Sequence, residues 1–436
     1  MEDNGRMSSH TADIADITNA VDVADVRVLA GPGLVADLRL LAEVADREFA
    51  SLGVRGAVTV LPGPAELEAA VLESSGPLVV LPGPDPEARA LIARHPRAVW
   101  LDLHRVAEPA GPGHLHGRGV WGLAWAIRHA VHRLRRPVRR VAYGAHPDQW
   151  AEVRRPHGSP DESGDGPRGD RQGGPGGDRW SGSGGDRWRG SRDDPKGGPR
   201  SGPGGAGGER QGGPREPVPV AVVLHGGYWR SVWGADLMDA LCADLAGRGL
   251  ETWNLEYRRP DLHGWAATTA DVAAGLALAA EGARGPVVVI GHSAGGQLAL
   301  RAAADDGRVA LAVSLAGVLD LVEGDRRRLS GGAVAAALGG PADEAPEVYA
   351  RSSPLERLPL QVPQLVVQGD GDDLDLVDLG RRYARAARAA GDDVTYLEAA
   401  GDHFDVIDPA SPIWRTTAEM ITGRVLRGSE GPPEGR

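Results

Sequence analysis

One segment constrains the fold of this chain more than any other, the run Gly-His-Ser-Ala-Gly at residues 291–295. It follows the β-branched apolar run 286–290, which is typical of a buried strand, and it precedes the helix-forming run 297–303. A serine flanked by glycines at a strand-to-helix turn is the pattern of a nucleophile elbow, in which small residues permit a sharp turn. The turn raises the Ser293 hydroxyl above the end of a sheet. Because the chain contains 63 glycines, the flanking strand and helix carry this prediction more than the motif itself.

A second glycine-containing segment, residues 225–230 with the sequence His-Gly-Gly-Tyr-Trp-Arg, follows the apolar run 220–224. Attack on an acyl group creates an oxyanion, which an enzyme must meet with preorganised N–H donors. Glycines let the backbone approach a substrate closely. We therefore assign the backbone N–H groups of Gly227 and Tyr228, together with that of Ala294, to an oxyanion hole. The alternative interpretation is a tight turn after a strand.

A serine is a poor nucleophile at its ordinary pKa, so it needs a base, and the base needs an acid that orients it. In an elbow architecture the order along the chain is serine, acid, histidine. The base is predicted to be His403, because no other histidine follows Ser293. His292 is expected to pack beside the elbow. The acid should follow the apolar run 364–367, where the residues leave four candidates: Asp370, Asp372, Asp373 and Asp375.

Composition excludes several classes of protein. A formal charge of −12 argues against a nucleic-acid binder, which needs clustered basic residues. The single cysteine, Cys242, excludes a disulfide framework and a cysteine-rich metal site. The polar start of the chain predicts no secretory signal, and no apolar stretch approaches the length of a membrane span. We expect a cytoplasmic protein that acts on a small molecule, with no nucleic-acid or membrane partner; the sequence is compatible with a homo-oligomer.

The first part of the chain alternates strand and helix patterns. Continuous apolar runs at 26–30, 54–61, 78–81 and 98–103 are typical of strands buried on both faces of a parallel sheet, and helical patterns separate them. The predicted organisation is a disordered tail at 1–25, an α/β domain at 26–136, a second domain at 137–425 and a disordered tail at 426–436.

A low-complexity tract at 156–216 combines glycine, proline, arginine and aspartate and contains internal repeats. Such a composition cannot offset its ordering entropy, so we expect disorder. The runs 138–143 and 151–155 are predicted to form an antiparallel pair, and 151–155 is predicted to pair in turn with 218–224. The tract would then be an insertion in a surface hairpin of the second domain, at little entropic cost, rather than an interdomain linker. Its two repeated tryptophans are interpreted as solvated loop residues, with a binding motif as the alternative.

Residues 317–355 lie between two predicted strands and are expected to form a cap over the site. They include an alanine-rich helix at 333–338 and the run Arg326-Arg327-Arg328. The arginines are interpreted as a solvated helix face, with an anion site as the alternative.

Residues 138–425 resemble the α/β-hydrolase superfamily, in particular the esterase- and lipase-like branch that includes kynurenine formamidase. The matching segments are 225–230, 254–259, 291–296 and 402–404. That family places its acid at the fifth position of an H-G-x-x-D stretch, which here is 368–372 and selects Asp372. Gln368 replaces the histidine of that stretch, a departure expected to have no catalytic meaning. The resemblance implies a mostly parallel eight-stranded sheet and hydrolysis of a small ester or aryl amide through an acyl-Ser293 intermediate, without metal or organic cofactor.

The first domain resembles type II 3-dehydroquinate dehydratase in segments 30–34, 81–84 and 119–126, which implies a flavodoxin-like sheet of five parallel strands. The catalytic residues of that family are missing. No tyrosine precedes Tyr143, and Leu81 stands where the family has an asparagine. We interpret the first domain as degenerate and kept for binding or assembly. His114 and His116 are interpreted as loop residues rather than metal ligands. The competing hypotheses are a dehydratase-related protein with a fused hydrolase and a non-catalytic scaffold.

Overall fold

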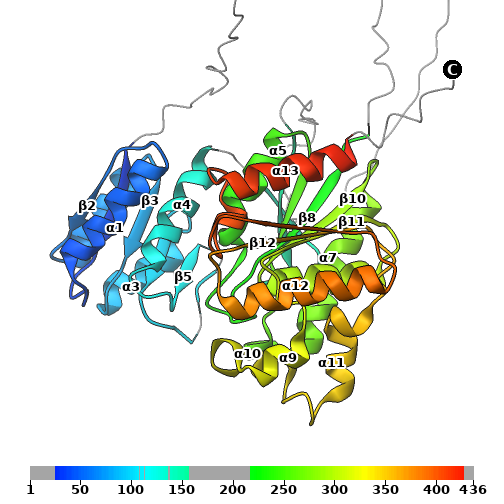
Figure 1. Cartoon of the computed structure of the whole chain (residues 1–436). Coiled ribbons are helices and arrows are strands. Elements are labelled where there is room, and N and C mark those ends of the chain that lie inside the picture. Colours follow the sequence, from blue (N-terminus) through cyan, green and yellow to red (C-terminus); the bar gives the residue numbers. More distant parts are fainter. Residues whose placement is uncertain (1–24, 108, 112, 136–137, 157–216, 427–436) are drawn as a thin grey trace, which may run out of the picture. The chain divides into compact units, whose positions relative to one another are not determined.

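The computed structural model describes residues 25–107, 109–111, 113–135, 138–156 and 217–426. Nearly all of the two predicted tails and of the low-complexity tract lies outside these residues, so the expectation of disorder there stays a prediction. The boundary between the two predicted domains also falls at residues that are not described. Within the described part, the chain forms two β-sheets that are covered by helices (Figure 1).

The first sheet has five parallel strands in the order β2-β1-β3-β4-β5, which is the order of flavodoxin-like sheets. This confirms the predicted parallel five-stranded sheet. Its strands are β1 (Val26–Ala30), β2 (Gly56–Val60), β3 (Leu78–Leu81), β4 (Val99–Asp102) and β5 (His114–His116).

Helices cover both faces of this sheet, which explains the continuous apolar strands. One core layer contains side chains of α1 (Leu38–Ser51) and α4 (Gly122–Arg135), and the other contains side chains of α2 (Pro64–Glu73) and α3 (Pro86–Arg94). Helices α1 and α3 begin at aspartates, Asp37 and Asp85, whose side chains accept hydrogen bonds from the first backbone N–H groups.

The prediction that His114 and His116 are loop residues is wrong. They lie in β5, which pairs in parallel with β4, and both are buried. His114 Nε2 lies 2.7 Å from Asp102 Oδ2, so a polar partner offsets the cost of burying the imidazole.

The second sheet has the order β13-β12-β11-β10-β8-β9-β7-β6. Strand β7 is antiparallel to both of its neighbours, and the pairs from β9 to β13 are parallel. The strands are β6 (Arg139–Ala142), β7 (Trp150–Arg154), β8 (Val220–Leu224), β9 (Glu251–Leu255), β10 (Val287–His292), β11 (Val309–Leu315), β12 (Gln364–Gly369) and β13 (Val394–Ala399).

Two core layers sandwich this sheet. One contains side chains of α7 (Trp265–Glu281), α8 (Ala294–Asp305) and α12 (Leu374–Ala389). The other contains side chains of α5 (Asp239–Gly247) and α13 (Pro412–Val425), which Figure 1 shows together on one face. Short helices in the connections are α6 (Pro260–His263), η1 (Ala235–Met238), η2 (Leu355–Arg357) and η3 (Asp405–Ile407).

The predicted pairing of residues 151–155 with 218–224 is wrong. Strand β7 pairs with β6 as expected, but its other neighbour is β9 rather than β8. The β8–α5–β9 crossover returns the chain in parallel to the free edge of β8, so β9 separates β7 from β8. The residues between β7 and β8 therefore connect strands that are not neighbours, and they do not close a hairpin.

The segment between β11 and β12 forms α9 (Leu321–Arg326), α10 (Leu329–Leu338) and α11 (Pro346–Ser352). The backbone is irregular at 330–332, where φ is positive, so the regular part of α10 is the predicted alanine-rich helix. Arg327 differs from the expected solvated residue, because it pairs with Glu323, Asp375 and Asp378 and so joins this segment to α12. Among the helices of the described residues, none combines the length and the apolar character needed to cross a membrane.

Candidate active site

Ser293 lies at the junction of β10 and α8 with a strained backbone, φ 54° and ψ −119°. Its N–H donates to Leu315 O at 2.8 Å, and its carbonyl accepts from Gly296 N at 2.9 Å. The flanking glycines are required by close packing. A Cβ on Gly291 would lie 1.9 Å from Gly295 O, and a Cβ on Gly295 would lie 2.2 Å from Leu224 O. The motif therefore has the tight strand-to-helix turn that its sequence predicts.

The segment 225–230 runs against this turn. A Cβ on Gly226 would lie 2.9 Å from the Ser293 Cβ, so only glycine permits the approach. The next three residues, 227–229, all have positive φ, at 109°, 49° and 57°. The buried Trp229 indole donates to Gln297 Oε1 on α8 at 3.1 Å, which ties the segment to the helix that begins after the serine. The structure thus brings Gly227 and Tyr228 into the neighbourhood of Ser293 and Ala294.

His403 and Asp372 follow neighbouring parallel strands, β13 and β12, and their side chains meet. His403 Nδ1 lies 2.8 Å from Asp372 Oδ2. Burial by itself would raise the pKa of Asp372, but the hydrogen bond and charge of His403 and two further donors lower it. The carboxylate is therefore ionised at neutral pH and orients the imidazole through Nδ1.

The other candidate acids have different surroundings. The Asp373 carboxylate caps α12 by accepting from the Asp375 N–H at 2.8 Å, and Asp375 pairs with Arg327 at 2.9 Å. Asp370 is exposed. Of the four carboxylates, Asp372 is the one that the structure places against His403.

Two further side chains, Gln368 and His292, contact the His403–Asp372 pair. Gln368 Nε2 donates to Asp372 Oδ2 at 2.8 Å, so the residue that replaces the family histidine contacts the predicted acid. The expectation that this replacement has no catalytic meaning stays a prediction. His292 packs beside the elbow as expected, and its Nε2 also lies 2.9 Å from the His403 carbonyl oxygen. Burial lowers the pKa of His292 to about 3, so the imidazole is neutral and Nε2–H donates. No sequence signal identified either contact, because both depend on the loops after β12 and β13.

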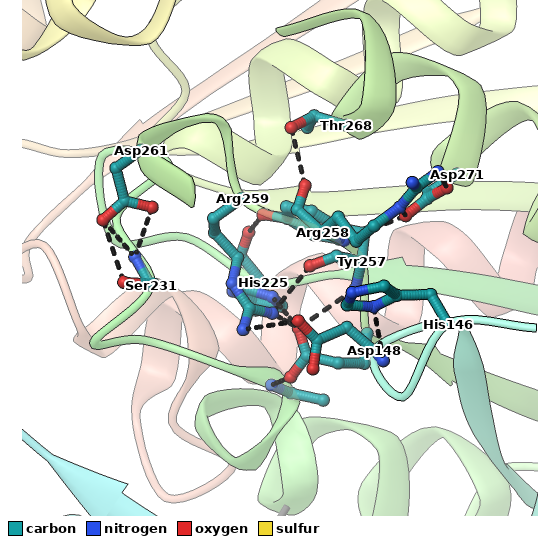
Figure 2. Close-up of polar contacts among 12 residues, drawn as sticks. His146, Asp148, His225, Ser231, Tyr257, Arg258, Arg259, Asp261, Thr268 and Asp271 are labelled. Carbon is teal, nitrogen blue, oxygen red and sulfur yellow. Dashed lines mark hydrogen bonds and ion pairs between the residues drawn. The ribbon is translucent and has the colours of Figure 1, made fainter. Parts of the chain in front are cut away.

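A buried network contacts His225, the first residue of segment 225–230, and sequence reasoning did not predict it. Figure 2 labels its members His225, Tyr257 and Arg259. Glu256 accepts from the Ala235 N–H at 3.0 Å, lies 3.1 Å from His225 Nε2 and pairs with Arg259. Burial opposes the charge of Glu256, but Arg259 and His225 lower its pKa to about 2. The Tyr257 hydroxyl donates to His225 O at 2.8 Å. The one signal for these residues was the family-like segment 254–259.

Residues 221–407 match a family described as alpha/beta hydrolase fold. These residues make up less than half of the 436-residue chain and include most strands of the second sheet. An overlapping part of the chain is similar to Esterase LipC of Mycobacterium tuberculosis (strain ATCC 25618 / H37Rv), with 28% identity over 228 residues. The match covers 45% of this chain and 56% of LipC, so the chain spans little more than half the length of that relative.

Solved structures with partial similarity include several esterases. A truncated carbohydrate esterase from gut microbiota is 16% identical with a TM-score of 0.43, covering 49% of this chain and 87% of that one. Esterase B from Lactobacillus Rhamnosis (HN001) is 18% identical with a TM-score of 0.42, covering 48% and 76%. A putative thioesterase from silicibacter sp. tm1040 is 19% identical with a TM-score of 0.45, covering 66% and 89%.

Proposed function

We propose that this protein is a serine hydrolase that cleaves small carboxylic esters through an acyl-Ser293 intermediate. One observation carries the proposal: Ser293, in a strained strand-to-helix turn, is linked through its neighbour His292 to the His403–Asp372 pair. The His292 ring contacts the His403 carbonyl oxygen, and the His403 ring contacts the buried Asp372 carboxylate. A strained turn of this kind persists only where the surrounding structure holds it, and such strain concentrates at functional sites.

In this proposal His403 is the general base and Asp372 orients it. His403 Nε2 takes the Ser293 proton while Ser293 Oγ forms a bond to the ester carbonyl carbon, and the carbonyl π electrons move onto oxygen. The N–H groups of Gly227, Tyr228 and Ala294 donate to that oxyanion. The protonated His403 then gives its proton to the departing alkoxide, which leaves the acyl-enzyme.

Hydrolysis of the acyl-enzyme repeats these roles with water as the nucleophile. His403 takes a proton from water, the hydroxide attacks the acyl carbon, and the proton returns to Ser293 Oγ as the carboxylic acid leaves. Asp372 stays ionised throughout. The similarity to Esterase LipC supports an ester as the substrate, and it gives no support to the aryl amide implied by the formamidase resemblance.

The test compares wild-type protein with Ser293→Ala and with Ser75→Ala, an exposed serine outside the site. Each protein is treated with a fluorophosphonate probe and offered p-nitrophenyl acetate, N-formylkynurenine and 3-dehydroquinate. We expect labelling and ester turnover in wild type and Ser75→Ala, and neither in Ser293→Ala. Turnover of N-formylkynurenine above that of the ester would replace the ester with an aryl amide.

Other outcomes would overturn the proposal. Ester turnover that survives Ser293→Ala would remove the serine from the reaction. Dehydration of 3-dehydroquinate that is unaffected by Ser293→Ala would favour the dehydratase-related alternative. Absence of labelling and of turnover with every substrate would favour a scaffold.

A further inference from the structure

The turn between β6 and β7 presents two metal-ligating side chains, His146 and Asp148, on a fixed backbone. The Gln149 N–H donates to His146 O at 2.9 Å, and the His146 N–H donates back to Gln149 Oε1 at 2.9 Å. Above them, the Tyr143 N–H donates to Gln149 O at 3.0 Å. The backbone of the turn is therefore preorganised, which lowers the entropic cost of binding a ligand.

A third ligating side chain, His263, reaches the same place from the end of α6. Its N–H donates to Arg259 O at 3.0 Å, and Gly264, with φ 78°, ends the helix directly after it. The rings of His146 and His263 are 4.7 Å apart between centroids, edge to face. Each of the three residues offers a ligand atom, and these atoms all lie within 4.8 Å of one another.

Two imidazoles and a carboxylate are a ligand set that zinc uses. Ligand atoms at zinc bond lengths in a tetrahedron are roughly 3.4 Å apart, so small side-chain rotations close the observed spacing. The Asp148 N–H donates to His146 Nδ1 at 3.2 Å, so this nitrogen carries a lone pair. A coordinate bond from Nδ1 to a metal would replace this long hydrogen bond. His263 is exposed, so water can complete the coordination.

Neighbouring arginines would repel a cation if their charges were not matched. Arg258 lies on Asp271, with Nη2–Oδ1 at 2.7 Å and Nε–Oδ2 at 2.9 Å. Arg259 pairs with Glu256 and approaches Asp148 more loosely, at 3.4 Å (Figure 2). Glu256 and Asp271 thus match the two guanidinium charges. The Asp148 carboxylate keeps the longer contact with Arg259, and its negative charge would attract a divalent ion.

We propose that His146, Asp148 and His263 bind one zinc ion. None of the three belongs to the Ser293–Asp372–His403 set, so the proposal does not depend on the proposed hydrolase activity. It departs from the family resemblance, which implies no metal. Through Arg259, the site adjoins the Glu256–His225 network that supports segment 225–230.

The experiment uses the full-length chain without a histidine tag, treated with chelator and dialysed. Zn²⁺ is titrated by calorimetry, and Co²⁺ is added separately to record visible d–d absorption. We expect one equivalent of Zn²⁺ to bind, with affinity at least 10-fold weaker in His146→Ala, Asp148→Asn and His263→Ala. The Co²⁺ spectrum should show tetrahedral or five-coordinate intensity in wild type and lose it in the three variants.

Two controls separate this site from other histidines. His104→Ala removes an exposed histidine elsewhere and should keep the metal. His403→Ala removes the histidine of the partly exposed His403–Asp372 pair, and this variant should also keep the metal. Circular dichroism and thermal melting check that each variant folds, and the exposed His263 variant decides the result if another does not.

The proposal is wrong if wild type binds no Zn²⁺ at micromolar concentration. It is equally wrong if the metal is retained by His263→Ala, or if it is lost in His403→Ala alone, since that would place the ion at the proposed catalytic pair.

Discussion

Each of the two sheets in this chain carries a histidine–aspartate pair, but the two pairs are built differently. In the first sheet His114 lies 2.7 Å from Asp102, and in the second His403 lies 2.8 Å from Asp372. The His114 side chain is 3% exposed, whereas the His403 side chain is 21% exposed. The first pair is sealed inside the fold, and the second can meet a substrate.

The partners of the two aspartates explain the difference further. Arg89 binds both oxygens of Asp102, at 2.7 and 2.9 Å, so that carboxylate is held between two cationic or donor groups. Burial would raise the pKa of Asp102, but His114 and Arg89 together lower it strongly. Asp372 instead receives neutral donors, from Gln368 and the Asp373 N–H. Among its hydrogen-bond partners in the described residues, His403 alone is an ionisable side chain. The two pairs therefore differ in exposure and in the charge of the groups around the carboxylate, and the catalytic role proposed above falls to the more exposed pair.

The largest expected effect separates the two histidines. His403→Ala should lower kcat for p-nitrophenyl acetate by on the order of 10⁵ to 10⁶, because the base is lost. His114→Ala should leave kcat unchanged, since its pair contacts no nucleophile. Steady-state kinetics on folded proteins measure both, and an equal loss in the two variants would contradict the comparison.

The next effect separates the aspartates of the second sheet. Asp372→Asn should lower kcat by on the order of 10³ to 10⁴, because an amide sets the wrong tautomer of His403. Asp370→Asn, two residues away and exposed, is the matched control and should have no effect. If Asp370→Asn causes the loss instead, the acid is assigned to the wrong residue.

A third effect concerns stability rather than rate. Asp102→Asn should lower the free energy of unfolding by about 3 kcal/mol, because it leaves Arg89 and the buried His114 without their carboxylate. Glu68→Ala, which breaks the more exposed pair with Arg94, should cost less than about 1 kcal/mol. Urea denaturation measures both values. Similar costs for the two variants would show that the buried pair in the first sheet contributes little.

The last effect is a pH dependence shared by the two regions. Burial lowers the pKa of His292 to about 3 and that of His116 to about 4, below the ordinary value of about 6.5. Between these values the unfolded chain binds a proton that the folded one does not, so stability falls as pH drops below about 6.5. His292→Gln and His116→Gln should each flatten that fall between about pH 6.5 and pH 4. Unfolding free energies measured across this range test it, and an unchanged slope would contradict buried neutral imidazoles.

The sequence predicted the first sheet from continuous apolar strands, and it missed β5. The reason is that β5 reads His-Leu-His, which carries no apolar run, and its burial depends on Asp102 and its neighbour β4. In the second sheet the sequence predicted the β6–β7 pair and placed β7 beside the wrong strand. Strand order across a crossover depends on where a helix returns the chain, which local patterns do not encode.

The sequence by itself determined the elbow around Ser293, because close approach of backbone to backbone admits only glycine at Gly291 and Gly295. The sequence also identified His403 as the candidate base, since it is the one histidine that follows Ser293. The residues by themselves left four carboxylates open, the family resemblance selected Asp372, and the structure places that side chain against His403. Only the tertiary structure decided that Gln368, His292 and Glu256 hold the surrounding groups. Local steric limits depend on residues that are neighbours in the sequence. Hydrogen-bond partners depend on the packing of strands that lie far apart in the chain.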